Sequence, residues 1–218
     1  MPRSKRNKVV HLTKTAKKDR EWKGGLIDDI RQCVDEYKNV YVFSWDNMRT
    51  NRLKLLRNEL STSRFFLGRN KVAQVAFGRT PEDEYKENLG ALSTEVTGER
   101  GLLFTDLNPK DVRKAFAAAT SDDYARSGFV ATETVEVPAG PMPQFLHSME
   151  PGLRKLGLPT KLNVGVIELI QDYTVCTKGE TLSPEQCRML KLFEKKMATF
   201  SLQLVCRWHD DTFEDYSE

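Results

Sequence analysis

The sequence lacks the features that mark secreted and membrane-spanning proteins. None of its 218 residues lie in a run that approaches the roughly 20 apolar residues of a membrane helix. The longest apolar runs, such as 40–45 and 164–170, have the length of strands. The first 20 residues are basic and polar, unlike the apolar centre of a signal peptide. There are only four cysteines and no C-x-x-C pair, which indicates reduced intracellular thiols and no disulfide framework.

Catalytic motifs are also missing. The chain has no Walker loop, no G-x-G-x-x-G and no G-x-S-x-G. Its three histidines, His11, His147 and His209, are far apart in the sequence, and two of them lie in the segments that we expect to be terminal tails. We therefore predict a protein that is not an enzyme, that needs no cofactor or metal and that has no small-molecule substrate. A small hydrolase with an unrecognised cysteine or carboxylate site is the competing hypothesis.

Charge is distributed unevenly along the chain, although its formal net value is only +3. Residues 1–80 carry a net charge of +11, whereas residues 81–218 carry −8. Such asymmetry indicates that one end of the protein meets a polyanion. Residues 1–20 hold eight basic residues against Asp19, and the cluster of Arg3, Lys5, Arg6 and Lys8 also resembles a nuclear import signal. A solvated arm kept for solubility is the alternative interpretation of this segment.

Apolar spacing in the first 120 residues predicts alternating helices and strands. Trp22, Leu26, Ile30, Cys33 and Val34 recur at steps of three and four, so a helix is expected over residues 13–38, with Thr13 as its N-cap. Strands are expected over 40–45, 64–67 and 101–105, and helices over 49–60 and after Gly68. Further helices are expected from Thr80-Pro81-Glu82 and from Asn108-Pro109 to Ala119. This alternation is typical of a layered α/β domain.

The pattern changes after Ser121. Residues 129–137 alternate between apolar and polar side chains and predict a half-exposed strand, and prolines and glycines then interrupt the chain. Residues 161–169 and 173–182 predict two more strands, Ser183-Pro184-Glu185 starts a helix to Met197, and residues 200–208 predict a last strand.

These elements predict an α/β fold with an inserted domain. We expect a basic N-terminal arm (1–20), a layered α/β RNA-binding domain (21–120 together with 183–208), a smaller inserted β-rich (α+β) domain (121–182) and an acidic, frayed tail (209–218).

A basic surface on the α/β domain is the candidate functional site. The expected helix over 49–60 carries Arg49, Arg52, Lys54 and Arg57, which offer forked and point-charge contacts to phosphate. The turn at Gly68 is followed by Arg69, Asn70 and Lys71, where Asn70 either caps a helix that holds a phosphate or caps it without any ligand. Phe65 and Phe66 lie in a strand, and we expect at least one of them to be core, so recognition of folded RNA by its shape and backbone fits better than base stacking.

Motifs in a fixed order resemble a known family. In chain order they read RLKLLRNEL, FFLGRNKVAQVAFG and GERGLLFTDLNPKDVRKAF, followed by GLPTKLNVGVIELIQDYTVCTKGETLSPEQCRMLKLF. This order resembles the stalk-base family of large-subunit ribosomal proteins and its inserted domain. The stretches MPRSKRNKVVHLTKTAKK, YKENLGAL and HSMEPGLRKLGLPT resemble a narrower, eukaryotic ribosome-assembly branch of that family.

The resemblance implies a role in ribosome biogenesis. Its expected partners are large-subunit rRNA at the stalk base, the pre-60S particle and neighbouring ribosomal proteins. The chain ends shortly after Trp208, without the family's long stalk-recruiting helices. The implied protein is therefore a nucleolar and nuclear placeholder that travels to the cytoplasm and is exchanged there for the stalk protein, with release by a dual-specificity-phosphatase-like factor. Mapped onto this sequence, the family's rRNA contacts are Arg49, Arg52, Lys54, Arg57, Arg69, Asn70 and Lys71, to which we add Arg3, Lys5, Arg6, Lys8, Lys14 and Lys17.

A protein-interaction module is the alternative function. In that interpretation the inserted domain, residues 121–182, recruits a partner protein to the pre-ribosome.

Overall fold

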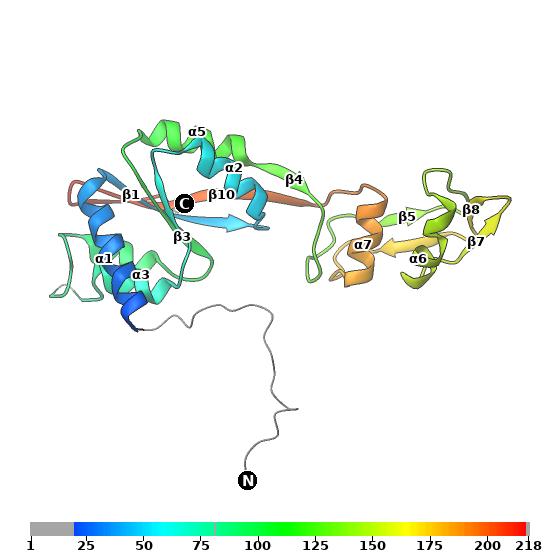
Figure 1. Cartoon of the computed structure of the whole chain (residues 1–218), viewed down its shortest axis with the longest axis horizontal. Coiled ribbons are helices and arrows are strands. Elements are labelled where there is room, and N and C mark those ends of the chain that lie inside the picture. The colour runs from blue at the N-terminus through cyan, green and yellow to red at the C-terminus, as the bar shows by residue number, and fades with distance from the viewer. Residues whose placement is uncertain (1–19, 81, 217–218) are drawn as a thin grey trace, which may run out of the picture. The chain divides into compact units, whose positions relative to one another are not determined.

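A computed structural model describes residues 20–80 and 82–216 (Figure 1). Its helices are α1 (Arg20–Glu36), α2 (Thr50–Glu59), α3 (Asn70–Phe77), α4 (Leu89–Glu95), α5 (Pro109–Ala119), the 3-10 helix η2 (His147–Met149), α6 (Glu150–Lys155) and α7 (Pro184–Leu192). Its strands are β1 (Asn39–Asp46), β2 (Arg64–Phe66), β3 (Arg100–Thr105), β4 (Ser121–Asp123), β5 (Val135–Val137), β6 (Gly140–Pro141), β7 (Thr160–Asn163), β8 (Val166–Leu169), β9 (Tyr173–Cys176), β10 (Ala198–His209) and β11 (Thr212–Asp215). No helix within the described ranges combines the length and the apolar character needed to cross a membrane.

A six-stranded sheet is the main element of the fold. Its strand order is β11-β10-β1-β3-β2, and β4 pairs with β10 outside this path. The central strand β1 has the nearly continuous apolar sequence NVYVFSWD, and Val40, Tyr41, Val42 and Phe43 are all fully buried. Such a run is typical of a strand that is covered on both faces. The mixed α/β architecture predicted from the sequence is therefore confirmed.

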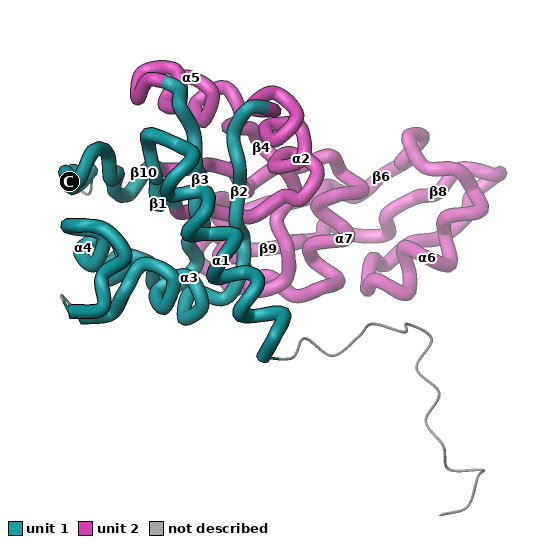
Figure 2. Tube along the Cα trace, turned by 60° about the vertical axis from the view of Figure 1, so that its left-hand side comes forward, with its two compact units in different colours: residues 1–43, 62–107, 204–218 teal, residues 44–61, 108–203 magenta. Residues whose placement is uncertain are grey.

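The described residues form two compact units (Figure 2). Unit 1 comprises residues 20–43, 62–107 and 204–216, and unit 2 comprises 44–61 and 108–203. In unit 1, α1 packs on α3 and α3 packs on α4. Their apolar faces enclose a core around Val34, Phe77, Leu92 and Phe104, together with Cys206 from β10.

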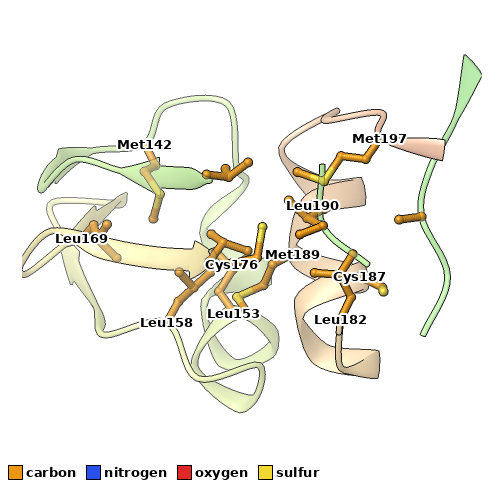
Figure 3. Close-up of a cluster of buried hydrophobic side chains, with 14 of the residues drawn as sticks. Met142, Leu153, Leu158, Leu169, Cys176, Leu182, Cys187, Met189, Leu190 and Met197 are labelled. Atoms are coloured by element: carbon orange, nitrogen blue, oxygen red, sulfur yellow. The ribbon is translucent and has the colours of Figure 1, made fainter. Parts of the chain in front are cut away.

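Unit 2 contains a separate, sulfur-rich core formed by residues between Ala125 and Ala198, so helix α7 packs with the expected inserted domain (Figure 3). Strands β5 and β9 pair with each other, and β6, β8 and β7 form a three-stranded sheet in that order. The core includes Met142, Cys176, Cys187, Met189 and Met197. Thioether side chains are flexible and fill irregular gaps, which suits a core built from short strands.

Helix α7 begins as its sequence predicts. Ser183 is its N-cap, and the Ser183 Oγ accepts a hydrogen bond from the Gln186 N–H at 3.2 Å. The Gln186 Oε1 in turn accepts one from the Ser183 N–H at 2.7 Å, which completes a capping box. Pro184 occupies the first turn, where its missing N–H costs nothing.

Several predicted elements differ from the structure. The segment 161–169 is a hairpin of β7 and β8, because Val164 and Gly165 both have positive φ and form a turn. Within 129–137 only β5 is a strand, and within 173–182 only β9, while Val130 and Thr181 form an isolated bridge. Helix α7 ends at Leu192, and the helix expected from residue 80 begins at Leu89 as α4. The tail expected to fray contains β11, which pairs with β10.

Candidate nucleic-acid interface

Helix α2 separates an apolar face from a cationic one. Leu53 and Leu56 are buried and anchor the helix, whereas Arg52, Lys54 and Arg57 are exposed. Glu59 is the one acid of the helix against three cations. The separation follows from the sequence RLKLLRNE, because residues three and four apart lie on the same side of a helix. Leu53 shares a side with Leu56 and Lys54 with Arg57, whereas Arg52 lies on a flank. The predicted exposure of these three cations is thus present in the structure.

Helix α5 adds cations that the sequence analysis did not assign. It packs against α2 within unit 2, and the two helices lie side by side (Figure 1). Val112 and Phe116 are buried, whereas Lys110, Arg113 and Lys114 are exposed. The signal was visible in PKDVRKAF, which interleaves cations with apolar residues as α2 does. Only the packing of the two helices shows that the helix carrying these cations lies beside α2.

Acids are few on α2 and α5. Lys54, Lys110 and Lys114 take part in none of the ion pairs found within residues 20–80 and 82–216. Asp111 is the acid on α5 itself, near the N-terminus where the helix dipole favours it. We define the α2–α5 face as Arg52, Lys54, Arg57, Lys110, Arg113 and Lys114. Exposed cations of this kind supply point-charge or forked contacts to phosphate.

Arg49, which the sequence places in the candidate site, is engaged inside unit 2. Its Nε donates to Asp123 Oδ2 at 2.6 Å, and its NH2 group donates to the Tyr124 carbonyl. The Arg49 side chain is only 11% exposed. Partial burial raises the pKa of Asp123, but hydrogen bonds from the Tyr124 N–H and Arg49, and the charges of Arg49 and Arg52, hold that pKa below its ordinary value. Arg49 therefore ties the start of α2 to the end of β4.

The second predicted cluster, Arg69 to Lys71, lies in unit 1. Arg69 and Lys71 are exposed, and α3 begins at Asn70. The prediction that Asn70 caps this helix is wrong: Arg69 is at the cap position and makes no side-chain capping bond. Instead, Asn70 Nδ2 donates to the Gly98 carbonyl at 2.7 Å. That bond connects the start of α3 to the segment just before β3. Arg69 and Lys71 are the two residues of this cluster that can offer a positive charge to phosphate.

The remaining predicted contacts lie outside the described residues. They are Arg3, Lys5, Arg6, Lys8, Lys14 and Lys17. Among the residues that are described, the candidate cations therefore form two separate groups, each within its own unit: the α2–α5 face in unit 2, and Arg69 with Lys71 in unit 1.

The aromatic pair Phe65 and Phe66 and the four cysteines pack inside the protein. Phe65 is buried with its ring edge-on to Phe43 at 6.0 Å, and Phe66 meets Phe104 in the same way at 5.5 Å. These contacts confirm that Phe65 belongs to the core. All four cysteines are buried, and burial raises the pKa of each thiol, that of Cys206 to about 12. A buried thiol with a raised pKa is a poor nucleophile.

The sequence matches two family descriptions. Residues 18–121 match "Ribosomal protein L10", and residues 125–194 match the insertion domain of the 60S ribosomal protein of that family. The first match contains α2, α3 and α5, and therefore every described residue of the candidate site.

Two relatives that match along nearly their full length give a narrower assignment. "Ribosome assembly factor mrt4" of Dictyostelium discoideum is 45% identical over 214 residues, covering 98% of this chain and 96% of the relative. "Ribosome assembly factor MRT4" of Saccharomyces cerevisiae is 36% identical over 225 residues, covering 97% and 95%. "Large ribosomal subunit protein uL10" of the archaeon Thermococcus onnurineus is 24% identical and covers 87% of this chain and 56% of its own length. Because the two Mrt4 proteins are 45% and 36% identical to this chain over nearly the whole of both sequences, the protein belongs to the ribosome assembly factor Mrt4 (mRNA turnover protein 4 homologue) family.

Proposed function

We propose that this protein binds the stalk-base rRNA of the pre-60S particle and holds that site as a placeholder for the ribosomal stalk protein. The α2–α5 face, together with Arg69 and Lys71, supplies contacts to the phosphate backbone. The basic residues Arg3, Lys5, Arg6, Lys8, Lys14 and Lys17 supply further contacts. The protein acts by occupancy and not by catalysis.

The observation that carries the proposal is the α2–α5 face itself. Two packed helices present six exposed cations, within the segment that matches ribosomal protein L10. Arginine side chains bind phosphate through a planar fork and lysines as point charges, so this face suits a polyanion. Because Phe65 is buried, recognition of the backbone and shape of folded RNA fits better than stacking on unpaired bases.

Mutual exclusion gives the proposed function its mechanism. If the assembly factor and the ribosomal stalk protein bind the same rRNA surface, the stalk protein enters only after the factor leaves. We place this exchange between nuclear and cytoplasmic pre-60S particles. Release by a dual-specificity-phosphatase-like factor is part of the proposal and follows from the family resemblance.

Binding of the full chain to a stalk-base rRNA fragment over a range of salt concentrations tests this proposal. The logarithm of the affinity should fall linearly with the logarithm of salt, by about 0.7–0.9 for each phosphate contacted. A double variant, Lys54→Glu with Lys71→Glu, should bind more weakly and with a shallower slope. Lys178→Glu with Lys191→Glu is the matched control, because both lysines are exposed cations of unit 2 outside the α2–α5 face.

Competition tests the placeholder mechanism directly. The ribosomal stalk protein should displace the bound chain from the rRNA fragment, with no ternary complex on a sizing column. A salt-independent affinity would contradict the electrostatic contacts, and a stable ternary complex would contradict mutual exclusion.

A further inference from the structure

An exposed apolar hairpin tip lies at the turn between β7 and β8 in the inserted part of unit 2. We define the hairpin tip as Leu162, Val164 and Val166, whose exposed fractions are 53%, 99% and 38%. Single exposed apolar residues are common on protein surfaces. Leu162 pairs with Ile167 and Val166 pairs with Asn163, so the side chains of Leu162 and Val166 lie on opposite faces of the hairpin, with Val164 at the turn between them. Three exposed apolar residues within five positions therefore make the end of the hairpin apolar on both faces and at its apex.

Leu162 lies on the same face of the hairpin as residues of the domain core. Leu162 is directly opposite Ile167 in the antiparallel pairing of β7 and β8, and Thr160 is opposite Leu169. Ile167 and Leu169 are buried in the core, whereas Leu162 extends beyond it. Residues opposite each other point to the same face of a sheet. Leu162 therefore adds exposed apolar surface on the face whose other apolar residues are buried in the core.

The apex residue is held in an unfavourable backbone conformation. Val164 has φ 46° and Gly165 has φ 83°. A two-residue hairpin turn with both φ values positive favours asparagine followed by glycine, and a β-branched residue is a strained choice at the first position. The valine thus places an apolar side chain in solvent at a position where a polar residue would fit without strain. Backbone strain of this kind is maintained at functional sites more often than elsewhere.

Charges beside the hairpin tip are already neutralised within the hairpin. Lys161 Nζ pairs with Glu168 Oε2 at 3.1 Å, and Asn163 Nδ2 donates to Glu168 Oε1 at 2.9 Å. Both carboxylate oxygens and the lysine are engaged, so the flanks carry no net charge. A phosphate backbone that approached this face would meet the Glu168 carboxylate and a lysine that is already paired.

We propose that the hairpin tip inserts into an uncharged apolar pocket on a protein of the pre-ribosomal particle. A convex apolar apex fits a concave apolar pocket, and neutral flanks fit a surface without strong charge. Two convex tips do not fit each other, which disfavours a second copy of this chain. The inference does not depend on the proposed rRNA contacts, which lie on other elements. The proposal assigns a specific surface to the alternative function of the inserted domain, which is to recruit a partner protein.

Thiol labelling tests the proposal in the full-length protein. In the variant Val164→Cys the new thiol is exposed, whereas the four natural cysteines are buried and react slowly. Its reaction with a maleimide should be at least tenfold slower in purified pre-60S particles than in the free chain. The control Lys178→Cys lies on an exposed turn of the same unit and should react equally fast in both states.

Three further measurements identify what covers the hairpin tip. A maleimide–benzophenone crosslinker attached to the thiol of the Val164→Cys variant should give a protein–protein product in the particle that survives ribonuclease. Protection of that thiol by the stalk-base rRNA fragment alone would overturn the proposal in favour of RNA. Protection in the free chain that grows with its concentration would overturn it in favour of self-association. Equal labelling of the new thiol in the particle and in the free chain, or equal protection of both variants, would overturn a specific contact at the tip.

Discussion

Arg49 is the residue whose role changes most between sequence and structure. Its guanidinium bonds Asp123 and the Tyr124 carbonyl and is almost entirely buried. We expect Arg49→Ala to lower the free energy of unfolding by about 1–3 kcal/mol, because the hydrogen bonds to a charged group are removed and their partners stay partly buried. Urea unfolding followed by circular dichroism measures this change. Lys54→Ala is the control and should stay within about 0.5 kcal/mol, as is usual for an exposed side chain.

The pH dependence of stability is a second measurement of the ion pair between Arg49 and Asp123. The pKa of Asp123 is lowered in the folded protein, so its ionised form stabilises the fold above the ordinary aspartate pKa of about 3.9. That contribution is lost as the pH falls through this value toward the lower folded pKa. The stability deficit of Asp123→Asn should therefore be largest near neutral pH and shrink below about pH 4. A stability deficit of Asp123→Asn that had the same size at neutral pH and below about pH 4 would contradict the ion pair.

Prediction at the level of single residues succeeded where the information was local. The exposure of Arg52, Lys54 and Arg57 follows from the positions of Leu53 and Leu56 on the same helix. The role of Arg49 does not, because its partner Asp123 lies 74 positions away. The prediction for Asn70 was wrong for the same reason. Its side chain donates a hydrogen bond to the Gly98 carbonyl, 28 positions away, and does not cap α3.

At the scale of elements, α5 should contribute to rRNA binding as much as α2 does. We expect Lys110→Glu with Lys114→Glu to weaken binding to the stalk-base fragment and to lower the salt slope by about one for each phosphate that is no longer bound. Arg52→Glu with Lys54→Glu should have a similar effect, because the two helices are packed together. Fluorescence anisotropy at several salt concentrations measures both the affinity and the slope.

A control separates this effect from a loss of net charge. Lys178→Glu combined with Lys191→Glu makes the same change in charge at exposed sites in unit 2 that belong to neither helix. It should leave most of the affinity intact. If the α5 variant bound as well as this control does, α5 would have no part in the interface.

Helices and strands with a strong apolar pattern could be predicted from the sequence. Strands whose bounds depend on a turn could not. The β1, β3 and α5 segments follow from continuous apolar runs and from the Asn108-Pro109 start. The β7–β8 hairpin was read as one strand, because Val164-Gly165 lacks the Asn-Gly or Asp-Gly sequence typical of such turns. Strand β11 was missed because four residues following a turn of two aspartates show little apolar pattern, and their pairing with β10 supplies the order.

At the scale of the whole molecule, charge asymmetry was informative although the net charge is small. The first 80 residues carry +11, and the described cations of the candidate site fall in this part, with the exception of those on α5. Sequence alone could indicate a basic end that meets a polyanion. It could not show that α5, beyond residue 80, packs beside α2, because that packing depends on the fold.

The N-terminal residues provide the test at this scale. Residues 1–19 carry seven cations and one acid, so deleting them removes much of the charge available to long-range attraction. We expect the deletion to weaken binding to the stalk-base rRNA fragment and to lower the salt slope by about 0.7–0.9 for each phosphate that is released. Replacing the same seven cations by glutamine in the full-length chain should reproduce both effects, because the contribution is electrostatic. If the glutamine variant bound rRNA like the unmodified chain while the deletion did not, the segment would act by interactions other than charge, and the proposed phosphate contacts of Arg3, Lys5, Arg6, Lys8, Lys14 and Lys17 would be wrong.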